Sequence, residues 1–149
     1  MSSKDKTFKF SVVMPIYNTI NFMREAIDSV INQTIGFEDN IQLILVDDGS
    51  SDGSDKVCEE YLAKYPDNVI FHKNEVNSRV SISRNNGIKY IEGEYVAFFD
   101  SDDVWPEDAF QKAYDFFKAH DDEIDVISCR MKFFGYKDGY FEGVDGKFQ

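Results

Sequence analysis

Short apolar runs alternate with longer amphipathic stretches along most of this chain, and this alternation limits the folds that it can adopt. The runs contain four to six residues each and cover residues 10–14, 41–46, 69–72, 95–99 and 124–129. Runs of this length are typical of strands that are buried on both faces. Strands that alternate with helices form mostly parallel sheets with right-handed crossovers. The sequence therefore predicts an α/β fold, a Rossmann-like three-layer α/β/α sandwich with a mostly parallel sheet.

The stretches between the runs carry apolar residues at helical spacing. The first has the stripe Phe22, Ala26, Ile27, Val30 and Ile31, preceded by three candidate N-cap residues, Asn18, Thr19 and Asn21. Further helices are predicted from about Ser54 to Tyr65, over Ser81–Ile91, and after Pro106, which suits a first helical turn.

The length of 149 residues suits a single domain, which we expect over residues 1–149 with a core at about residues 8–130. Beyond Phe133 the alternation gives way to segments that contain Gly, Tyr and Asp. The chain then stops at Gln149 with no clear end to the fold. We therefore expect a domain that is truncated at its C-terminal end.

The formal net charge of −12 argues against a nucleic-acid partner, which needs a basic surface, and against direct adsorption to an anionic membrane. The N-terminal residues 1–9 lack the apolar core of a signal peptide. No apolar run approaches the ~20 residues of a membrane span. Cys58 and Cys129 lie among apolar residues and are expected to be free, buried thiols. We therefore expect a cytoplasmic location, with the full-length protein able to work at the inner membrane face.

Three unusual segments follow three of the predicted strands. They are Pro15-Ile16-Tyr17-Asn18, Asp47-Asp48-Gly49-Ser50 and Asp100-Ser101-Asp102-Asp103. Ligands of open α/β sheets bind beyond the carboxyl ends of the strands, and these ends meet at one edge of a parallel sheet. Up to five carboxylates would then surround one cleft, an arrangement that requires a cation or hydrogen-bond donors. The sequence therefore predicts one binding site at this edge.

The Asp100–Asp103 segment has the spacing of a site for a hard divalent cation, because carboxylates two apart can serve one ion directly and through water or ligand. Mn²⁺ or Mg²⁺ is the expected cofactor. The alternative is an acidic start to the following helix, which the helix dipole favours. The Asp47-Asp48 pair can hydrogen-bond a nucleobase edge and ribose hydroxyls, and its alternative is an ordinary turn.

Two other patterns are weaker. A calcium-loop spacing comprises Asp48, Ser50, Asp52, Gly53 and Glu59, but an apolar strand and not a helix precedes it. Arg84 can neutralise a diphosphate or pair with the acidic cluster, whereas Arg79 is expected to form a surface ion pair. The sequence contains no P-loop, no G-x-G-x-x-G and no Ser-His-Asp arrangement, so the corresponding enzyme classes lack support.

Together these segments resemble the GT-A-fold glycosyltransferases of family 2, specifically their N-terminal nucleotide-sugar-binding portion. The matching stretches cover residues 12–18, 29–34, 46–52, 83–88, 93–103 and 105–106, in the family's order and spacing. The resemblance extends over about residues 8–130. It departs at Asn77-Ser78-Arg79, where the family often has glycine at the position of Arg79.

The resemblance implies a role for each site residue. Those assigned to the nucleotide-sugar are Pro15, Tyr17, Asn18, Asp47, Asp48, Arg84, Asp100, Ser101 and Asp103, and Asp102 is assigned as the direct metal ligand. The implied reaction is inverting transfer from a UDP-sugar or similar donor to a hydroxyl of a glycan, lipid-linked or polymer acceptor, in bacterial surface polysaccharide or teichoic acid synthesis. The family's general base lies downstream of the metal loop, and no residue after Cys129 is assigned to it.

Three alternatives remain at this stage. A non-catalytic nucleotide-sugar-binding fragment would share every feature above. A nucleotidyltransferase would carry a Gly-rich, Lys- or Arg-bearing loop after its first strand, where this chain has Pro15-Ile16-Tyr17-Asn18. A receiver-like signalling domain would have its acid pair after the first strand, whereas here the acidic turns follow the second and the fourth.

Overall fold

The computed structural model describes residues 6–120, 123–129, 132–133 and 139–140. The chain divides into two compact units, residues 1–115 and 116–149. The first unit contains the four-stranded sheet and the helices that cover it. In the second, β5 (Lys132–Phe133) pairs antiparallel with β6 (Gly139–Tyr140). Within the described ranges, no helix is both long and apolar enough to cross a membrane.

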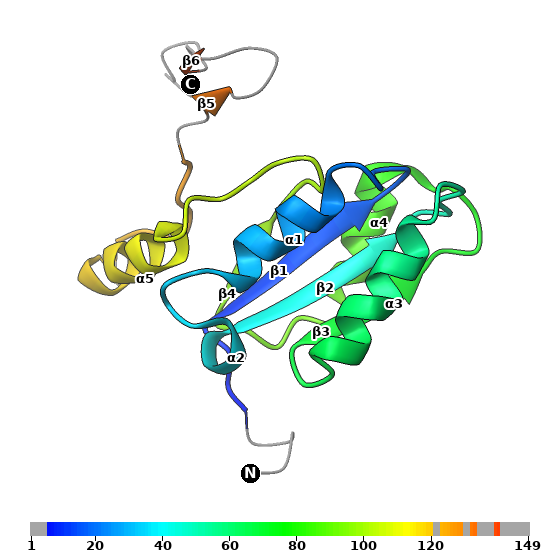
Figure 1. Ribbon diagram of the computed structural model, residues 1–149. Helices are drawn as coiled ribbons and strands as arrows, with labels where there is room; N and C mark the ends of the chain where they lie inside the picture. The colour runs from blue at the N-terminus through cyan, green and yellow to red at the C-terminus, as the bar shows by residue number, and fades with distance from the viewer. Residues whose placement is uncertain (1–5, 121–122, 130–131, 134–138, 141–149) are drawn as a thin grey trace. The chain divides into compact units, whose positions relative to one another are not determined.

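The sheet of the first unit is parallel throughout (Figure 1). Its strands are β1 (Phe10–Ile16), β2 (Ile41–Asp47), β3 (Val69–Lys73) and β4 (Tyr95–Phe98), in the order β3-β2-β1-β4. Every residue of the central strands β1 and β2 is buried, as their continuous apolar runs predict. The order places the ends of β1, β2 and β4 side by side, which is the arrangement that a shared site requires.

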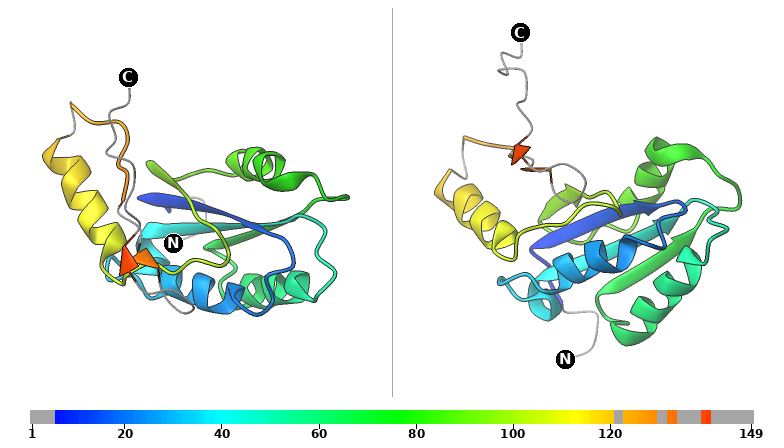
Figure 2. Two further views of the ribbon diagram at one scale, coloured as in Figure 1. Left: turned by 90° about the horizontal axis from the view of Figure 1, so that it is seen from above. Right: turned by 45° about the horizontal axis from the view of Figure 1, so that its top comes forward.

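Helices cover both faces of this sheet, which confirms the predicted three-layer α/β/α fold (Figure 2). One layer contains α1 (Met23–Ile31) and α3 (Ser54–Lys64), and α4 (Arg79–Ile88) lies on the opposite face. A short helix, α2 (Phe37–Asn40), precedes β2. The last helix, α5 (Ala109–Ala119), begins in the first unit and continues into the second.

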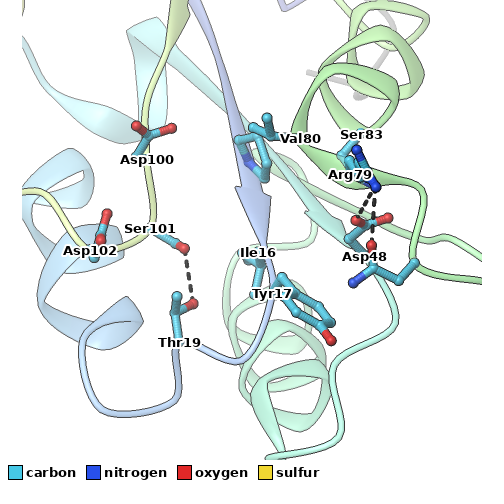
Figure 3. Close-up of a pocket in the computed structure, with 12 residues that line it drawn as sticks. Ile16, Tyr17, Thr19, Asp48, Arg79, Val80, Ser83, Asp100, Ser101 and Asp102 are labelled. Carbon is cyan, nitrogen blue, oxygen red and sulfur yellow. Dashed lines mark hydrogen bonds between the residues drawn. The ribbon is translucent and has the colours of Figure 1, made fainter.

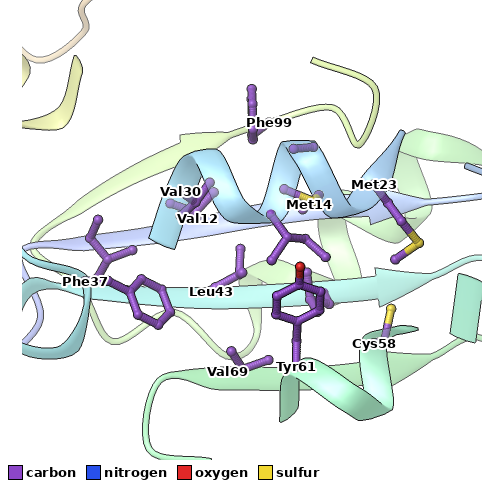
Figure 4. Close-up of a cluster of buried hydrophobic side chains, with 14 of the residues drawn as sticks. Val12, Met14, Met23, Val30, Phe37, Leu43, Cys58, Tyr61, Val69 and Phe99 are labelled. Carbon is purple, nitrogen blue, oxygen red and sulfur yellow. The ribbon is translucent and has the colours of Figure 1, made fainter. Parts of the chain in front are cut away.

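The larger core lies between the sheet and the α1/α3 layer (Figure 4). Its fully buried side chains include Val12, Met14, Ile27, Leu43 and Cys58. A smaller core of Val13, Ile44 and Val46 lies on the α4 side. There, a Cβ built on Gly87 would lie 2.4 Å from Cγ1 of Val13, so only glycine lets α4 approach the sheet this closely. This approach packs the last turn of α4 against β1 and β2.

Several predicted boundaries were wrong, and each has a local cause. β1 continues through Pro15 to Ile16, whereas the sequence had placed its end at Met14. The strand tolerates Pro15, which lacks an N–H, because β1 and β4 pair only as far as Val13 and Phe98. The carbonyl of Val13 accepts the last hydrogen bond on this side, from the N–H of Phe99. No ladder partner on that side then requires an N–H from residue 15.

The first helix begins at Met23, with Phe22 as its N-cap and no side-chain capping bond. Two of the three predicted caps are engaged elsewhere: the hydroxyl of Thr19 contacts that of Ser101, and Oδ1 of Asn18 accepts from Ser51. α4 occupies residues 79–88 instead of 81–91.

The predicted strand at residues 124–129 is also wrong. A run becomes a strand only where a neighbour supplies hydrogen bonds, and in the second unit the described strand pairing joins only β5 and β6. Val126 is 81% exposed and Cys129 is exposed, so the prediction of a buried thiol fails for Cys129. It holds for Cys58, and both thiols are free.

Candidate functional site

A cavity of about 490 Å³ lies at the carboxyl ends of the sheet strands, within the first unit (Figure 3). It is lined by Pro15, Ile16, Tyr17, Thr19, Asp48, Asn77, Arg79, Val80, Ser83, Asp100, Ser101 and Asp102. These residues come from the ends of β1, β2 and β4 and from the start of α4. The three separate segments singled out in the sequence therefore border one cavity, with Asp48 and Asp102 both in its wall.

Asp48 is a buried carboxylate at the end of β2, with 3% of its surface exposed. Its Oδ1 accepts hydrogen bonds from the side chain of Asn74 and the backbone N–H of Ser78, both at 2.8 Å. Its Oδ2 accepts from the backbone N–H of Arg79, also at 2.8 Å. Burial alone would raise the pKa of this carboxyl, but the hydrogen bonds outweigh it and hold the pKa below its ordinary value. Asp48 is therefore a fixed negative charge.

A network of hydrogen-bonded polar side chains holds Asp48 in place. Besides its bond to Asp48, the Asn74 amide donates to the hydroxyl of Ser83 at 3.0 Å. Its carbonyl oxygen accepts from the side chain of Asn86 at 2.9 Å. Asn74 and Ser83 are buried, so this network ties the end of β2 to α4 at the cavity wall.

Asn18 and Asp47 are two of the four predicted site residues that are absent from the cavity wall, together with Arg84 and Asp103. Asp47 is fully buried, and both its carboxylate oxygens lie 3.3 Å from the backbone N–H of Ser50. Asn18 has a φ of +52°, a conformation that asparagine tolerates, and its backbone N–H donates to the hydroxyl of Ser50 at 3.0 Å. With its bond from Ser51, Asn18 joins the loop after β1 to the loop after β2. Both residues hold the loops that form the site.

The Asp100–Asp103 turn is more exposed than the turn after β2. Asp100 forms an ion pair with Arg84, with Nη2 and Oδ1 2.9 Å apart. Ser101 is buried and its hydroxyl lies 2.9 Å from that of Thr19, which connects this turn to the loop after β1. The carboxylate of Asp102 is exposed and makes no hydrogen bond or ion pair with any described residue.

Asp103 shows that negative charge accumulates at this turn. It lies just outside the cavity lining. Partial loss of solvation and the negative charges of Asp102 and Asp100 raise the pKa of its carboxyl above the ordinary value. The turn thus concentrates negative charge that described side chains only partly offset.

The donor set fits a divalent cation that is shared with a ligand. The described residues contain no group of three or more His, Cys, Asp or Glu that could hold a metal by itself. Mg²⁺-type ions do not need one, because they are commonly held by one or two carboxylates together with substrate phosphates and water. The unpaired carboxylate of Asp102, in a turn whose charges repel, meets that requirement.

Arg84 pairs with the acidic cluster, which is one of its two predicted roles, whereas Arg79 differs from its prediction. Arg84 does not line the cavity; its ion pair holds Asp100 beside it, its Cζ lies 5.9 Å from the ring centroid of Phe98, and its buried Nε has no hydrogen-bond partner among the described residues. Arg79 was expected to form a surface ion pair. It lines the cavity instead and has a φ of +72°. Arg79 thus adopts the left-handed backbone conformation that glycine adopts most easily.

The sequence analysis missed several wall residues: Thr19, Asn77, Arg79, Val80 and Ser83. The sequence carried one signal for Arg79: it stands where the family often has glycine, so a long side chain is added next to a binding loop. The calcium-loop reading finds no support. Asp52 accepts from the backbone N–H groups of Ile20 and Ser54, each at 3.0 Å, and thereby joins two loops.

Solved structures with related sequences have the same fold. The S. aureus TarS 1–349 structure, in complex with UDP-GlcNAc, superposes with a TM-score of 0.71 at 32% identity, covering 76% of this chain and 32% of that one. The mannosyltransferase PcManGT from Pyrobaculum calidifontis, in complex with GDP-Man and Mn²⁺, gives a TM-score of 0.67 at 22% identity, covering 73% and 32%. The second likeness concerns the fold alone. The fold is that of the GT-A glycosyltransferases.

The sequence comparisons identify the family. The model of glycosyl transferase family 2 matches residues 11–142, so the chain belongs to that family. The minor teichoic acid biosynthesis protein GgaB of Bacillus subtilis (strain 168) is 49% identical over 133 residues. That match covers 89% of this chain and 15% of GgaB, so the chain spans only a small part of this relative's length.

Proposed function

We propose that this chain is the donor-binding part of a metal-dependent glycosyltransferase that transfers a sugar from a UDP-sugar to a hydroxyl, with inversion at the anomeric carbon. The observation that carries the proposal is the presence of Asp48 and Asp102, from distant parts of the sequence, in the wall of one cavity. A volume of about 490 Å³ is within the range of small-molecule sites. The TarS complex with UDP-GlcNAc supports the choice of donor.

The nucleoside is assigned to the Asp48 side of the cavity. A carboxylate has about four acceptor positions, and the hydrogen bonds described above use two on Oδ1 and one on Oδ2. Oδ2 therefore keeps the capacity to accept from an N–H of a nucleobase. Tyr17, whose surface is 49% exposed, offers a ring on which a base can stack, and Pro15 completes the apolar wall.

The diphosphate is assigned to the Asp102 side. Asp102 would hold Mn²⁺ or Mg²⁺, and the bound cation would stabilise the charge that develops on the departing diphosphate. Asp100, held by Arg84, would contact the ribose, and Asp103 would orient the turn. The general base remains unassigned, because no described residue is identified by its position as that group.

The acceptor is proposed to be a glycan, a lipid-linked sugar or a polymer of the bacterial cell surface. The name of GgaB, a minor teichoic acid biosynthesis protein, supports teichoic acid or a related polysaccharide. A cytoplasmic site of action, at the inner face of the membrane, remains a prediction from the sequence. Neither a nucleotidyltransferase nor a receiver domain has a specific observation in its favour.

Thermal unfolding tests donor binding. The chain is melted with UDP, GDP, CDP and ADP, each with and without Mn²⁺. A ligand at 100 times its dissociation constant adds about 2.7 kcal/mol to the free energy of unfolding. We expect such a shift for UDP that requires Mn²⁺, and its loss in Asp102→Asn.

Asp67→Asn, an exposed substitution outside the cavity, is the matched control and should retain the shift. The absence of any nucleotide shift in the unaltered chain would contradict donor binding. Release of sugar from UDP-sugar, measured in parallel, separates a catalytic chain from a non-catalytic donor-binding one.

A further inference from the structure

Thr19, in the loop after β1, is held through its backbone by the starts of both helices that cover one face of the sheet. Its N–H donates to the hydroxyl of Ser54, the first residue of α3, at 3.2 Å. Its carbonyl oxygen accepts from the N–H groups of Phe22 and Met23 at the start of α1, both at 2.9 Å. The position of the Thr19 backbone is therefore set by α1 and α3.

The side chain of Thr19 connects this fixed point to the acidic turn after β4 (Figure 3). Its hydroxyl lies 2.9 Å from that of Ser101, which is 82 residues away along the chain. Ser101 is buried, with 5% of its surface exposed, and it directly precedes Asp102. A buried hydroxyl that loses its partner costs free energy. The pair therefore restricts the position of the Ser101 backbone and, with it, that of Asp102.

The second side-chain contact of the acidic turn restrains it less. Asp100 pairs with Arg84, but 52% of the Asp100 side chain and 37% of the Arg84 side chain are exposed. Exposed ion pairs contribute little, because water and salt compete for both charges. Of the two side-chain contacts that join residues 100–103 to other described segments, the hydroxyl pair is therefore the better shielded from water.

We propose that Thr19 is a positioning residue for the cation: its hydroxyl holds Ser101 so that the carboxylate of Asp102 keeps a fixed place in the cavity wall. The proposal rests on the proposed function, since it concerns the cation that Asp102 would hold. Asp102 has no hydrogen bond with a described residue, so its place depends on the backbone that this pair holds. Loss of a group that supports a metal ligand typically weakens metal binding by about 10- to 100-fold.

Calorimetric titration with UDP in excess Mn²⁺ tests the proposal on the full chain. Thr19→Val removes the hydroxyl but keeps the branched shape, and we expect it to weaken UDP binding by about tenfold. Thr19→Ser keeps the hydroxyl and should bind within about twofold of wild type. Ser101→Ala should lose as much as Thr19→Val, and the double variant should lose no more than either single variant. Thr34→Val alters an exposed threonine outside the cavity and is the control that should bind like wild type.

Hydrogen exchange of the unliganded protein follows the turn without metal or nucleotide. The N–H of Asp103 donates to the carbonyl oxygen of Asp100 at 3.2 Å, within the turn. Its exchange should be faster in Thr19→Val than in wild type or Thr34→Val, while exchange in the buried strands β1 and β2 stays the same. A residue that only contacted the nucleotide would leave this exchange unchanged.

Four results would overturn the role of Thr19 and leave the proposed function standing. They are unchanged UDP affinity in Thr19→Val, additive losses in the double variant with Ser101→Ala, unchanged exchange at Asp103, and faster exchange throughout β1 and β2. Additive losses would mean that the two hydroxyls act separately, and faster exchange of the strands would indicate a general loss of stability. Failure of the wild-type chain to bind UDP in Mn²⁺ would overturn both proposals.

Discussion

The two acidic turns that border the cavity compensate their charge in opposite ways. After β2, Asp48 is buried and accepts three hydrogen bonds from Asn74, Ser78 and Arg79, which lower its pKa. After β4, Asp102 is exposed and has no described partner, and neighbouring charges raise the pKa of Asp103. The charge of Asp48 is therefore compensated within the folded chain, whereas under the proposed function a bound cation would compensate the charge of Asp102. Under the proposed function, the turn after β2 would form a rigid base site and the turn after β4 an adjustable diphosphate site.

Removal of the buried carboxylate should produce the largest effect on stability. Asp48→Ala removes the acceptor of three hydrogen bonds, from Asn74, Ser78 and Arg79, and we expect the free energy of unfolding to fall by about 2–4 kcal/mol. Asp102→Ala, its counterpart in the β4 turn, should change it by less than about 0.5 kcal/mol, because no described partner is lost. Urea denaturation of both variants measures the contrast. Equal losses of unfolding free energy in the two variants would show that the two carboxylates are stabilised to the same extent.

Acid should reduce the difference in stability between wild type and Asp48→Ala. The pKa of Asp48 is lower in the folded state than in the unfolded state, so its contribution is fully present above the ordinary carboxyl pKa. It is lost as the pH falls through the depressed folded value. The gap between wild type and Asp48→Ala should therefore be constant from pH 7 to about pH 5 and narrow below about pH 4. A gap that widens on acidification would contradict the assignment.

The smallest expected effect is a gain in stability, and it comes from substitution of Asp103. The pKa of Asp103 is raised in the folded state, so its charged form opposes folding at neutral pH, and the penalty disappears once the group is protonated in both states. Asp103→Asn should therefore raise the melting temperature slightly at pH 7 in the absence of metal. The gain should vanish below the ordinary carboxyl pKa. Differential scanning calorimetry across this pH range detects it, and a loss of stability at pH 7 would show that the repulsion is compensated.

Much of the fold could be predicted from the sequence because the central strands are buried on both faces. The continuous apolar runs of β1 and β2 leave little doubt about their conformation, and their acidic ends identify the edge of the sheet that carries the cavity. The run at 124–129 has a similar composition but forms no strand. Composition alone does not supply the neighbouring backbone on which a strand depends.

The sequence predicted which residues line the cavity but not the hydrogen bonds that they form. Asp48, Asp100, Ser101 and Asp102 all line the cavity, as strand-end reasoning predicts. The sequence did not reveal that Asp48 would bind the start of α4, because its partners Ser78 and Arg79 lie 30 and 31 residues away along the chain. It also misplaced Arg79, since the direction of that side chain follows from a left-handed backbone that arginine rarely adopts.

The central claim is that one nucleotide joins the two acidic turns, and a crystal structure of the chain with UDP and Mn²⁺ tests it most directly. Anomalous diffraction from manganese locates the cation independently of the nucleotide density. The account predicts one manganese peak at coordination distance from a carboxylate oxygen of Asp102, about 2.0–2.2 Å, with the uracil edge against Asp48. A manganese peak away from Asp102, or a uracil bound away from Asp48, would contradict it.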